Sequence, residues 1–157
     1  MRLGSVTGSA GPFQSPERKR RVRPATAGRT FLPEREAVAI TPAVARASAG
    51  ASEHLRIARV ANLVPAMETL QSAGLWVWGV EQDPAARRYA ATDWSRPLAI
   101  VVGSEGFGLR RLVRERCDGL VCLPMHGRVG SLNAAVAGSV VLYEICRYRE
   151  DGGSVGS

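Results

Sequence analysis

Apolar and polar residues are distributed along the chain in segments that are typical of strands. Residues 74–80 (GLWVWGV) are rich in the aromatic and β-branched side chains that favour strands. Residues 98–102 (LAIVV) form a continuous apolar run, the pattern of a strand buried on both faces in a parallel sheet. Residues 55–60 alternate like an edge strand, residues 30–32 are expected to end a strand, and residues 120–123 form a short one.

Between these strands the chain carries signals for helices. Asn62 is expected to cap a helix that runs to Ala73, and Pro65 fits because it falls in the first turn. Further helices are predicted over residues 42–49, 108–116 and 131–148, and the polar segment 81–96 is expected to be a long loop with one helical turn. Strands that alternate with helices predict an α/β fold, with a mostly parallel sheet and helices on both of its faces.

Charge separates the first 30 residues from the rest of the chain. The 157 residues carry a formal net charge of +7 and are 45% hydrophobic, which suits one compact domain. Seven basic residues and one acidic residue lie within residues 1–30, which show neither helical nor strand periodicity. We therefore expect an irregular basic tail over residues 1–30, one domain over residues 31–150 and a flexible tail over residues 151–157. The basic tail is expected to be solvated, with non-specific attraction to nucleic acid as the alternative.

Cysteine usage and hydropathy indicate where the protein works. The three cysteines, Cys117, Cys122 and Cys146, lack the C-x-x-C spacing of zinc or dithiol sites, and their odd number argues against a disulfide framework. No apolar run reaches the roughly 18 residues that a membrane span requires, and no apolar segment near the N-terminus resembles a signal peptide. The sequence therefore predicts a cytoplasmic protein without a membrane span.

A glycine-rich turn follows the apolar run directly. Residues 103–108 read Gly-Ser-Glu-Gly-Phe-Gly, and such a turn before a helix exposes backbone N–H groups to polar or anionic ligand groups. Its spacing matches neither the dinucleotide fingerprint nor a P-loop, and Ser104 lacks the flanking glycines of a nucleophile elbow. On its own the turn is as consistent with a structural role as with a binding role. Glu105 is its first candidate functional residue, and complementing the helix dipole is the alternative for it.

A second cluster, residues 123–133 (LPMHGRVGSLN), opens the last predicted helix. The carboxyl ends of parallel strands share one edge of a sheet, where α/β folds bind ligands, so we expect this cluster beside the glycine-rich turn. Ser131 is expected to be the helix N-cap, and Asn133 is expected to be buried and hydrogen-bonded. His126 has no companion at metal-ligand spacing, so no metal site is expected. Trp76, Trp78 and Phe107 are candidates for stacking on nucleobases, although alternate strand positions more often form core.

These two segments carry a resemblance to a known family. Residues 98–147 (LAIVVGSEGFGLRRLVRERCDGLVCLPMHGRVGSLNAAVAGSVVLYEICR) resemble the C-terminal half of the SpoU (TrmH-type) RNA ribose 2′-O-methyltransferases of the SPOUT class. The family's second motif corresponds to residues 103–108 and its third motif to residues 123–133. The resemblance extends upstream and covers about residues 31–149.

The resemblance implies an enzyme that uses S-adenosylmethionine to methylate rRNA or tRNA. It also implies a C-terminal trefoil knot, which composition and periodicity do not predict. In such a protein a homodimer would form through the final helix, which suits the small and apolar residues 134–143. By matching motif positions, the cofactor would contact Gly103, Leu123 and Leu132, with Met125 and Gly106 nearby, and the reacting ribose would face Glu105, Ser131 and Asn133.

One part of the family pattern is missing. Relatives carry a first motif, N-x-G-x-x-x-R, whose arginine is thought to promote removal of the 2′-OH proton, and nothing assigns that role to Arg46 here. The N-terminal portion is therefore expected to be truncated, or frame-shifted over residues 1–30. Three hypotheses follow. The first is a truncated or degenerate methyltransferase that transfers methyl groups slowly or not at all, the second is a non-catalytic RNA- or protein-binding remnant, and the third is an unstable gene product.

Overall fold

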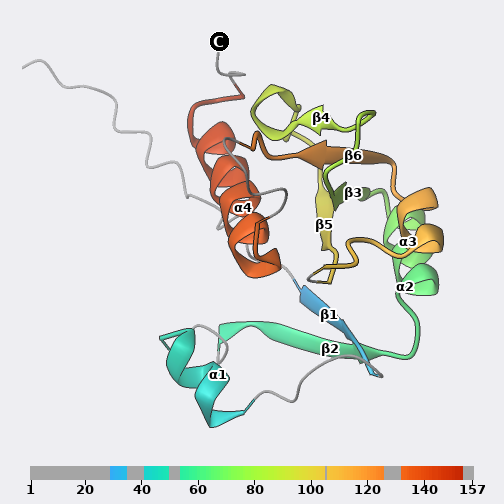
Figure 1. Cartoon of the computed structure of the whole chain (residues 1–157), viewed down its shortest axis with the longest axis vertical. Coiled ribbons are helices and arrows are strands. Elements are labelled where there is room, and N and C mark those ends of the chain that lie inside the picture. The colour runs from blue at the N-terminus through green and yellow to red at the C-terminus, as the bar shows by residue number, and fades with distance from the viewer. Residues whose placement is uncertain (1–28, 35–40, 50–53, 105, 126–131, 154–157) are drawn as a thin grey trace, which may run out of the picture.

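The computed structural model of the chain describes residues 29–34, 41–49, 54–104, 106–125 and 132–153. Within them, strands and helices alternate along the chain (Figure 1). This alternation confirms the predicted α/β class, while the expected tail over residues 1–30 lies almost entirely outside the described residues and stays a prediction. In chain order the elements are β1 (Arg29–Pro33), α1 (Pro42–Ala47), β2 (Arg56–Val60), α2 (Leu63–Ser72), β3 (Trp76–Val80), β4 (Arg87–Arg88), the 3₁₀ turn η2 (Tyr89–Ala91), β5 (Leu98–Val102), α3 (Arg111–Glu115), β6 (Gly119–Cys122) and α4 (Ala134–Glu150).

The strands form two sheets in which every pair is parallel. β1 pairs with β2 in a two-stranded sheet, from Arg29 opposite Arg56 to Pro33 opposite Val60. The larger sheet has the strand order β4-β6-β3-β5. β3 and β6 are its two inner strands, and β3 pairs in full register with β5 from Trp76 opposite Leu98 onward. All four strands therefore end at the same edge, which is the edge where the sequence places both motifs.

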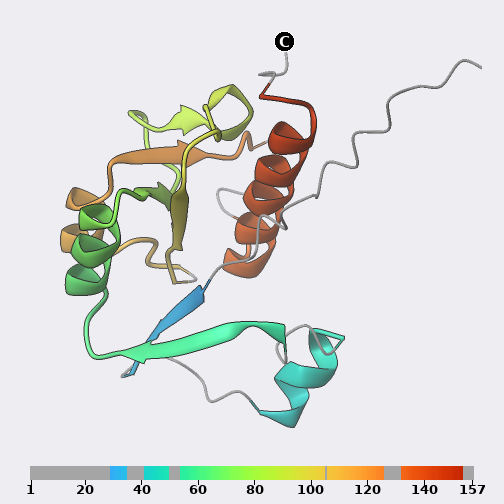
Figure 2. The same cartoon turned by 180° about the vertical axis from the view of Figure 1, so that it is seen from behind.

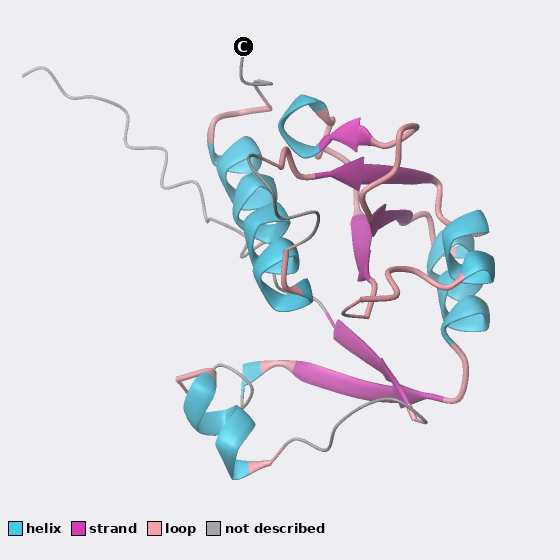
Figure 3. Cartoon of the chain, viewed as in Figure 1, coloured by secondary structure: helices cyan, strands magenta, loops and turns pink. Residues whose placement is uncertain are grey.

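Helices cover both faces of the larger sheet, as predicted (Figures 1, 2 and 3). α4 lies against one face, and α2 and α3 lie against the other. Alternate residues of β3 serve the two faces, because successive strand side chains point in opposite directions. Trp78 packs in the cluster on the α4 side, and Val77 packs in the cluster on the α2 and α3 side. The first cluster contains Trp78, Val80, Trp94, Val121, Leu123, Val141, Ile145 and Tyr148, and the second contains Met67, Val77, Leu109 and Val113.

Close packing of α4 on β5 depends on small residues in the helix. A Cβ on Gly138 would lie 3.2 Å from Cγ2 of Val102, tighter than ordinary van der Waals contact. The C-terminal end of α4 is held separately, since Nε of Arg149 donates to the carbonyl oxygen of Trp94 over 3.1 Å. The helix is therefore fixed at both ends against the same face of the sheet.

Several boundaries differ from the predictions. β5 is only partly buried along its length rather than buried on both faces, because it lies at the edge of the sheet and pairs with β3 alone among the described strands. Within residues 81–96 the expected helical turn is present as η2, but the two-residue strand β4 is too short to leave a pattern. α3 is shorter than predicted, because the glycine turn extends to Gly108 in a left-handed conformation.

Two expectations about the whole chain have different outcomes. Within the described residues, no helix has the length and apolar character needed to cross a bilayer. The expected knot depends on the path of residues 126–131, which lie outside the described residues, so it stays a prediction.

Candidate functional site

The glycine-rich turn after β5 closes on itself. Ser104 and Gly108 exchange backbone hydrogen bonds in both directions, at 3.1 Å from Ser104 N and 3.0 Å from Gly108 N. Gly106 and Gly108 have φ angles of 80° and 64°, values that favour glycine. Gly103 lies directly under this closure, and a Cβ there would collide with the carbonyl carbon of Gly108 and come within 2.6 Å of the Leu109 nitrogen. The glycine spacing is therefore what lets the turn fold so tightly.

A pocket of about 290 Å³ opens at this turn, at the lower end of the range for small-molecule sites. It lies at the carboxyl edge of the sheet, with the ends of β3 and β5 on one side and the beginning of α4 on the other. Polar and apolar groups line it in nearly equal measure, and the polar side chains come from the loops. The lining residues are Val80, Glu81, Gln82, Val102, Gly103, Ser104, Gly106, Phe107, Gly108, Leu123, Leu132, Ala134 and Ala137.

The Glu81 side chain joins the end of β3 to the glycine turn. Its Oε1 accepts a 3.3 Å hydrogen bond from the backbone N–H of Leu109, and a Cβ on Gly108 would lie only 2.6 Å from that oxygen. Its other oxygen, Oε2, is buried and has no hydrogen-bond partner in the part of the chain that the structure describes. Buried polar atoms are normally paired, so this oxygen requires a hydrogen-bond donor from outside the described residues.

Neighbouring contacts fix the rest of the pocket floor. The Glu81 backbone nitrogen donates to the carbonyl oxygen of Val121 over 3.0 Å. Nε2 of Gln82 donates to the carbonyl oxygen of Leu123 over 2.6 Å. The carboxyl ends of β3 and β6 are thus tied together by backbone and side-chain bonds, which gives the pocket a rigid base.

Four of the five residues expected to contact the cofactor line this one pocket: Gly103, Gly106, Leu123 and Leu132. Met125 is described and partly buried, but it is not among the lining residues. Glu105 and Ser131 lie outside the described residues, so their expected positions stay predictions. The structure therefore brings the two motifs together, as their place after parallel strands predicted.

Asn133 behaves differently from the prediction. It is exposed rather than buried, and it is the N-cap of α4, the position expected for Ser131. Its Oδ1 accepts hydrogen bonds from the backbone nitrogens of Ala135 at 3.0 Å and Val136 at 3.3 Å. These N–H groups lie two and three positions after Asn133, the usual arrangement for a cap, so the side chain does not need burial to find partners.

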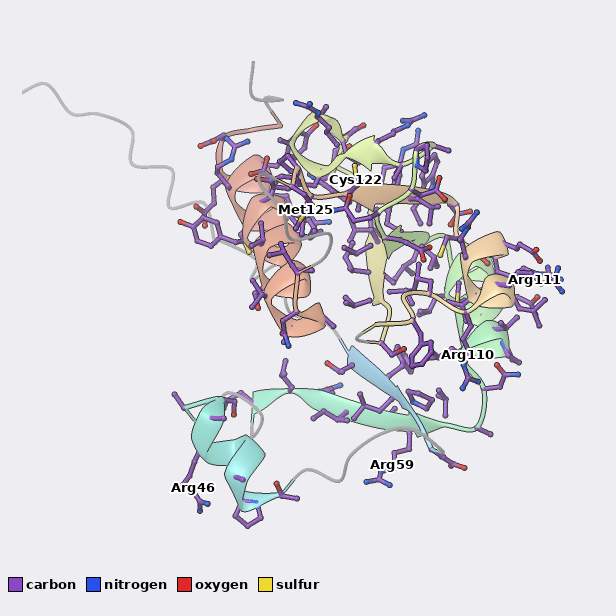
Figure 4. The ribbon with its side chains drawn as sticks, viewed as in Figure 1. Arg46, Arg59, Arg110, Arg111, Cys122 and Met125 are labelled. Carbon is purple, nitrogen blue, oxygen red and sulfur yellow. The ribbon has the colours of Figure 1, made fainter. Side chains whose placement is uncertain are left out.

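The arginine side chains labelled in Figure 4 lie away from the pocket. Figure 4 shows Arg46 on α1, pointing away from the larger sheet, and Arg59 on β2 in the same part of the molecule. Arg110 and Arg111 lie at the beginning of α3, where Arg111 pairs with Glu115 at 3.1 Å. Among the described residues that line the pocket there is no arginine. The structure therefore gives no support to Arg46 as a substitute for the first-motif arginine.

Comparison with known proteins identifies the family. The profile of the SpoU rRNA methylase family matches residues 20–143, which is most of the chain. The chain belongs to the SpoU rRNA methylase family. YacO of Bacillus subtilis, which carries the provisional name of a TrmH family tRNA/rRNA methyltransferase, is 49% identical to it over 119 residues, or 75% of this chain and 47% of YacO. This SpoU family chain thus spans about half the length of the curated relatives it matches.

Solved structures agree with the family assignment. The SpoU methyltransferase AviRb from Streptomyces viridochromogenes, crystallised in complex with the cofactor AdoMet, superposes with a TM-score of 0.71 at 29% identity, over 83% of this chain and 55% of AviRb. An RNA 2′-O ribose methyltransferase superposes with a TM-score of 0.69 at 28% identity, over 80% of this chain and 48% of that protein. The fold of this SpoU family chain is therefore the α/β fold of SPOUT methyltransferases.

Sequence reasoning did not find Glu81. It falls in the segment that the sequence predicts as a long polar loop, because a single carboxylate after a strand has no local signature. The available signal was its position, since Glu81 directly follows the strongest strand and therefore falls on the same sheet edge as the two motifs.

Proposed function

We propose that this chain binds S-adenosylmethionine in the pocket and directs its methyl group to a ribose 2′-hydroxyl of rRNA or tRNA. The observation that carries the proposal is the pocket itself, which is lined both by the glycine turn and by Leu132, from the two motifs. Membership of the SpoU family and the likeness to an AdoMet-bound methyltransferase support it. We place this reaction in the cytoplasm, which the unpaired Cys117, Cys122 and Cys146 support.

The residues present fit the chemistry of this cofactor. Val80, Val102 and Leu123 provide an aliphatic surface suited to a purine ring and a thioether. Oε2 of Glu81, which has no hydrogen-bond partner among the described residues, is an acceptor for a hydroxyl or ammonium group. When bound, the cofactor supplies an electrophilic methyl group on a sulfonium. The pocket residues then hold and orient it, and this positioning alone can lower the barrier substantially.

We assign roles to the predicted residues on this basis. The cofactor is held by Gly103, Gly106, Leu123 and Leu132, with Met125 beside them, and the ribose is faced by Glu105, Ser131 and Asn133. A ribose hydroxyl is a weak acid, so a group that accepts its proton contributes roughly 10²–10⁴-fold to the rate. We assign that role to Glu105, the only carboxylate within the two motifs.

Phe107 supports the RNA part of the proposal. It lines the pocket and is 91% exposed, at the tip of a turn held by glycines on both sides. An aromatic ring in that position offers a stacking surface for an unpaired base, which is worth about 1–3 kcal/mol per base. Phe107→Ala should therefore weaken RNA binding while leaving the affinity for free cofactor within a few-fold of wild type.

A second copy of the chain is the proposed partner along α4. Val136, Leu142 and Tyr143 are large apolar or aromatic residues of this helix that are 49%, 39% and 76% exposed. Exposed apolar surface on a single helix favours a self-complementary contact between two copies. Sedimentation analysis should give a dimer for the wild type and a larger monomer fraction for Tyr143→Glu.

Calorimetry with S-adenosylhomocysteine tests the proposed function first. Wild type should bind, and Leu132→Arg should not, because the new side chain fills the pocket. Leu112→Arg is the matched control: Leu112 is a comparably exposed leucine on α3 that does not line the pocket, and the variant should bind as wild type does. Absence of heat and of thermal stabilisation at millimolar ligand would refute the cofactor site.

Transfer of a tritiated methyl group to rRNA and tRNA tests the reaction itself. A methyl group on the ribose 2′-oxygen makes the next phosphodiester bond resistant to alkali, so the labelled product should be an alkali-stable dinucleotide. Methyl transfer to a base would contradict the proposed acceptor. Cofactor binding without transfer would instead support the alternative, a non-catalytic RNA- or protein-binding domain that keeps the pocket.

A further inference from the structure

The carboxylate of Glu81 is held in place from one side only. Its backbone nitrogen is bonded to Val121, and its Oε1 is bonded to Leu109, so the side chain cannot swing out to solvent without breaking the latter contact. Oε2 is buried without a partner among the described residues, and the side chain lines the pocket. Keeping a carboxylate oxygen in such a place is unfavourable unless a donor arrives with the ligand.

The terminal torsion of a glutamate side chain is soft. Because its rotation is broad and roughly two-fold, the carboxylate can turn toward the pocket while one oxygen still accepts from Leu109. Gly108 leaves room for this, since a Cβ at that position would press on Oε1 at 2.6 Å. Glu81 can therefore accept one hydrogen bond from the N–H of Leu109 and another from a ligand at the same time.

The position of the Glu81 carboxylate indicates which hydrogen-bond donor of the ligand it contacts. The reacting methyl group must reach RNA at the open side of the pocket, where Phe107 is 91% exposed. Oε2 is buried, so its partner belongs to the part of the ligand that lies away from the reacting centre. A carboxylate at the carboxyl end of a parallel strand is well suited to accept from the vicinal hydroxyls of a ribose.

We propose that Glu81 accepts a hydrogen bond from a ribose hydroxyl of the bound nucleoside and so makes the pocket selective for ribonucleosides over deoxyribonucleosides. The inference rests on the proposed function, because it takes an adenosine-containing cofactor as the occupant. It adds to the proposed function a residue, Glu81, that lies outside both sequence motifs, and the ligand group that this residue binds.

The test is a cycle that changes the protein and the ligand together. Wild type and Glu81→Gln are titrated by calorimetry with S-adenosylhomocysteine, 5′-methylthioadenosine and the 2′-deoxy and 3′-deoxy forms of the latter. In wild type, loss of the hydroxyl that Glu81 accepts from should lower the affinity roughly tenfold or more, as expected for a bond to a charged group. Glu81→Gln should bind both parent ligands more weakly by a similar factor and should no longer distinguish the deoxy form.

Glu115→Gln is the matched control. Glu115 is an exposed glutamate on α3 that does not line the pocket, and its variant should keep the wild-type preference for ribose. Thermal unfolding without ligand should show that Glu81→Gln is folded, because glutamine retains an acceptor for Leu109.

Three results would overturn the inference. If each deoxy ligand bound more weakly than 5′-methylthioadenosine by the same factor in wild type and in Glu81→Gln, Glu81 would not contact the hydroxyls. If Glu81→Gln bound S-adenosylhomocysteine more weakly than wild type but bound 5′-methylthioadenosine equally well, the carboxylate would contact the ammonium group of S-adenosylhomocysteine instead. Failure of wild type to bind any of these ligands would overturn the proposed function as well. The first two results, in which wild type binds, would overturn only the role of Glu81.

Discussion

Tyr148 on α4 donates a 2.8 Å hydrogen bond from its hydroxyl to Oδ1 of Asp93, 55 residues earlier in the chain. The tyrosine is only 5% exposed and belongs to the larger hydrophobic cluster, whereas Asp93 lies in an exposed part of the loop before β5. The contact therefore joins the C-terminal half of the helix to a segment that contributes no strand residue to the sheet. It also makes that junction sensitive to the charge of Asp93.

Tyr148→Phe should lower the free energy of unfolding by about 1 kcal/mol, because the ring stays packed and only the hydrogen bond is lost. Urea denaturation at neutral pH measures the change. Tyr143→Phe is the matched control: that tyrosine lies on the same helix and is 76% exposed, so loss of its hydroxyl should change stability very little. Equal effects of the two substitutions would contradict the structural role of the bond.

The effect of Tyr148→Phe should also depend on pH. Hydrogen bonds from Ser95, and then from the Tyr148 hydroxyl, lower the pKa of Asp93 from its ordinary value of 3.8. A carboxyl group with a depressed folded pKa contributes stability above its unfolded pKa and loses it as the pH falls through the folded pKa. The difference between wild type and Tyr148→Phe should thus be constant from about pH 5 to about pH 8 and shrink in acid, roughly below pH 4.

Gly103→Ala should disrupt the glycine turn. A Cβ there collides with backbone atoms of Gly108, which cannot move without breaking the bonds between Ser104 and Gly108. We expect a loss of stability of about 2 kcal/mol and a loss of cofactor binding. Gly106→Ala is the comparison: nothing lies within 4 Å of its Cβ, and its φ of 80° alone should cost about 1 kcal/mol. A milder effect at Gly103 than at Gly106 would contradict the tight packing of the turn.

Asn133 allows the capping role to be separated from a role toward RNA. Asn133→Ala should lower the stability by about 1 kcal/mol, since two backbone N–H groups of α4 lose their acceptor. Asn133→Asp should retain the cap and the stability, because aspartate caps helices as well as asparagine does. If the amide also faces the ribose, Asn133→Asp should reduce methyl transfer despite normal thermal unfolding. Full activity of a stable Asn133→Asp would restrict the residue to its structural role.

The burial of the Cys117 thiol predicts that the protein loses stability at high pH. Burial, followed by the negative charges of Asp118 and Glu81, raises the pKa of its thiol from 9.0 to about 11. Because the folded state holds this proton more tightly, the stability it contributes is complete below pH 9 and is lost as the pH rises toward 11. The loss should be about 1 kcal/mol, reduced by the partial exposure of the thiol to solvent.

Urea titrations between pH 8 and pH 11 measure this loss. Cys117→Ala should remove most of the pH-dependent decline, although it lowers stability at pH 8 by leaving a small cavity. Cys146→Ala, at a second partly buried cysteine, should leave the decline unchanged. A decline of the same size in Cys117→Ala would assign it to other groups.

The sequence predicted the architecture of the site better than its chemistry. The aromatic and β-branched residues of β3 and the continuous apolar run of β5 were enough to place both strands, and parallel strands bring the segments after them to one edge. That is why residues 103–108 and 123–133 could be expected at one site although they are far apart in the chain, whereas the choice of Gly103, Leu123 and Leu132 within them rests on the resemblance to the family. Local rules also identified Asn62 as a cap, which the structure confirms with a 3.0 Å bond from Val64.

The errors arose where the outcome depends on contacts distant in sequence. Glu81 gains its significance from Leu109 and Gly108, which no local pattern connects to it. The apolar run of β5 could not reveal that its strand lies at the edge of the sheet, because strand order is set by the whole topology. Asn133 is expected in the interior because it opens a helix of small, apolar residues, but the two-residue offset between Ser131 and Asn133 decides which side chain reaches the free N–H groups.

The two hydrophobic clusters on opposite faces of the larger sheet have a consequence for how the molecule opens. Ala134 and Ala137, in the first turns of α4, and Leu132 just before it line the pocket, whereas Val80 and the glycine turn belong to the sheet side. Detachment of α4 would remove that wall and could leave the cluster around Met67 intact. A ligand that touches both walls therefore stabilises the attachment of the helix by mass action. Amide hydrogen exchange should slow in α4 far more than in α2 when the pocket is filled.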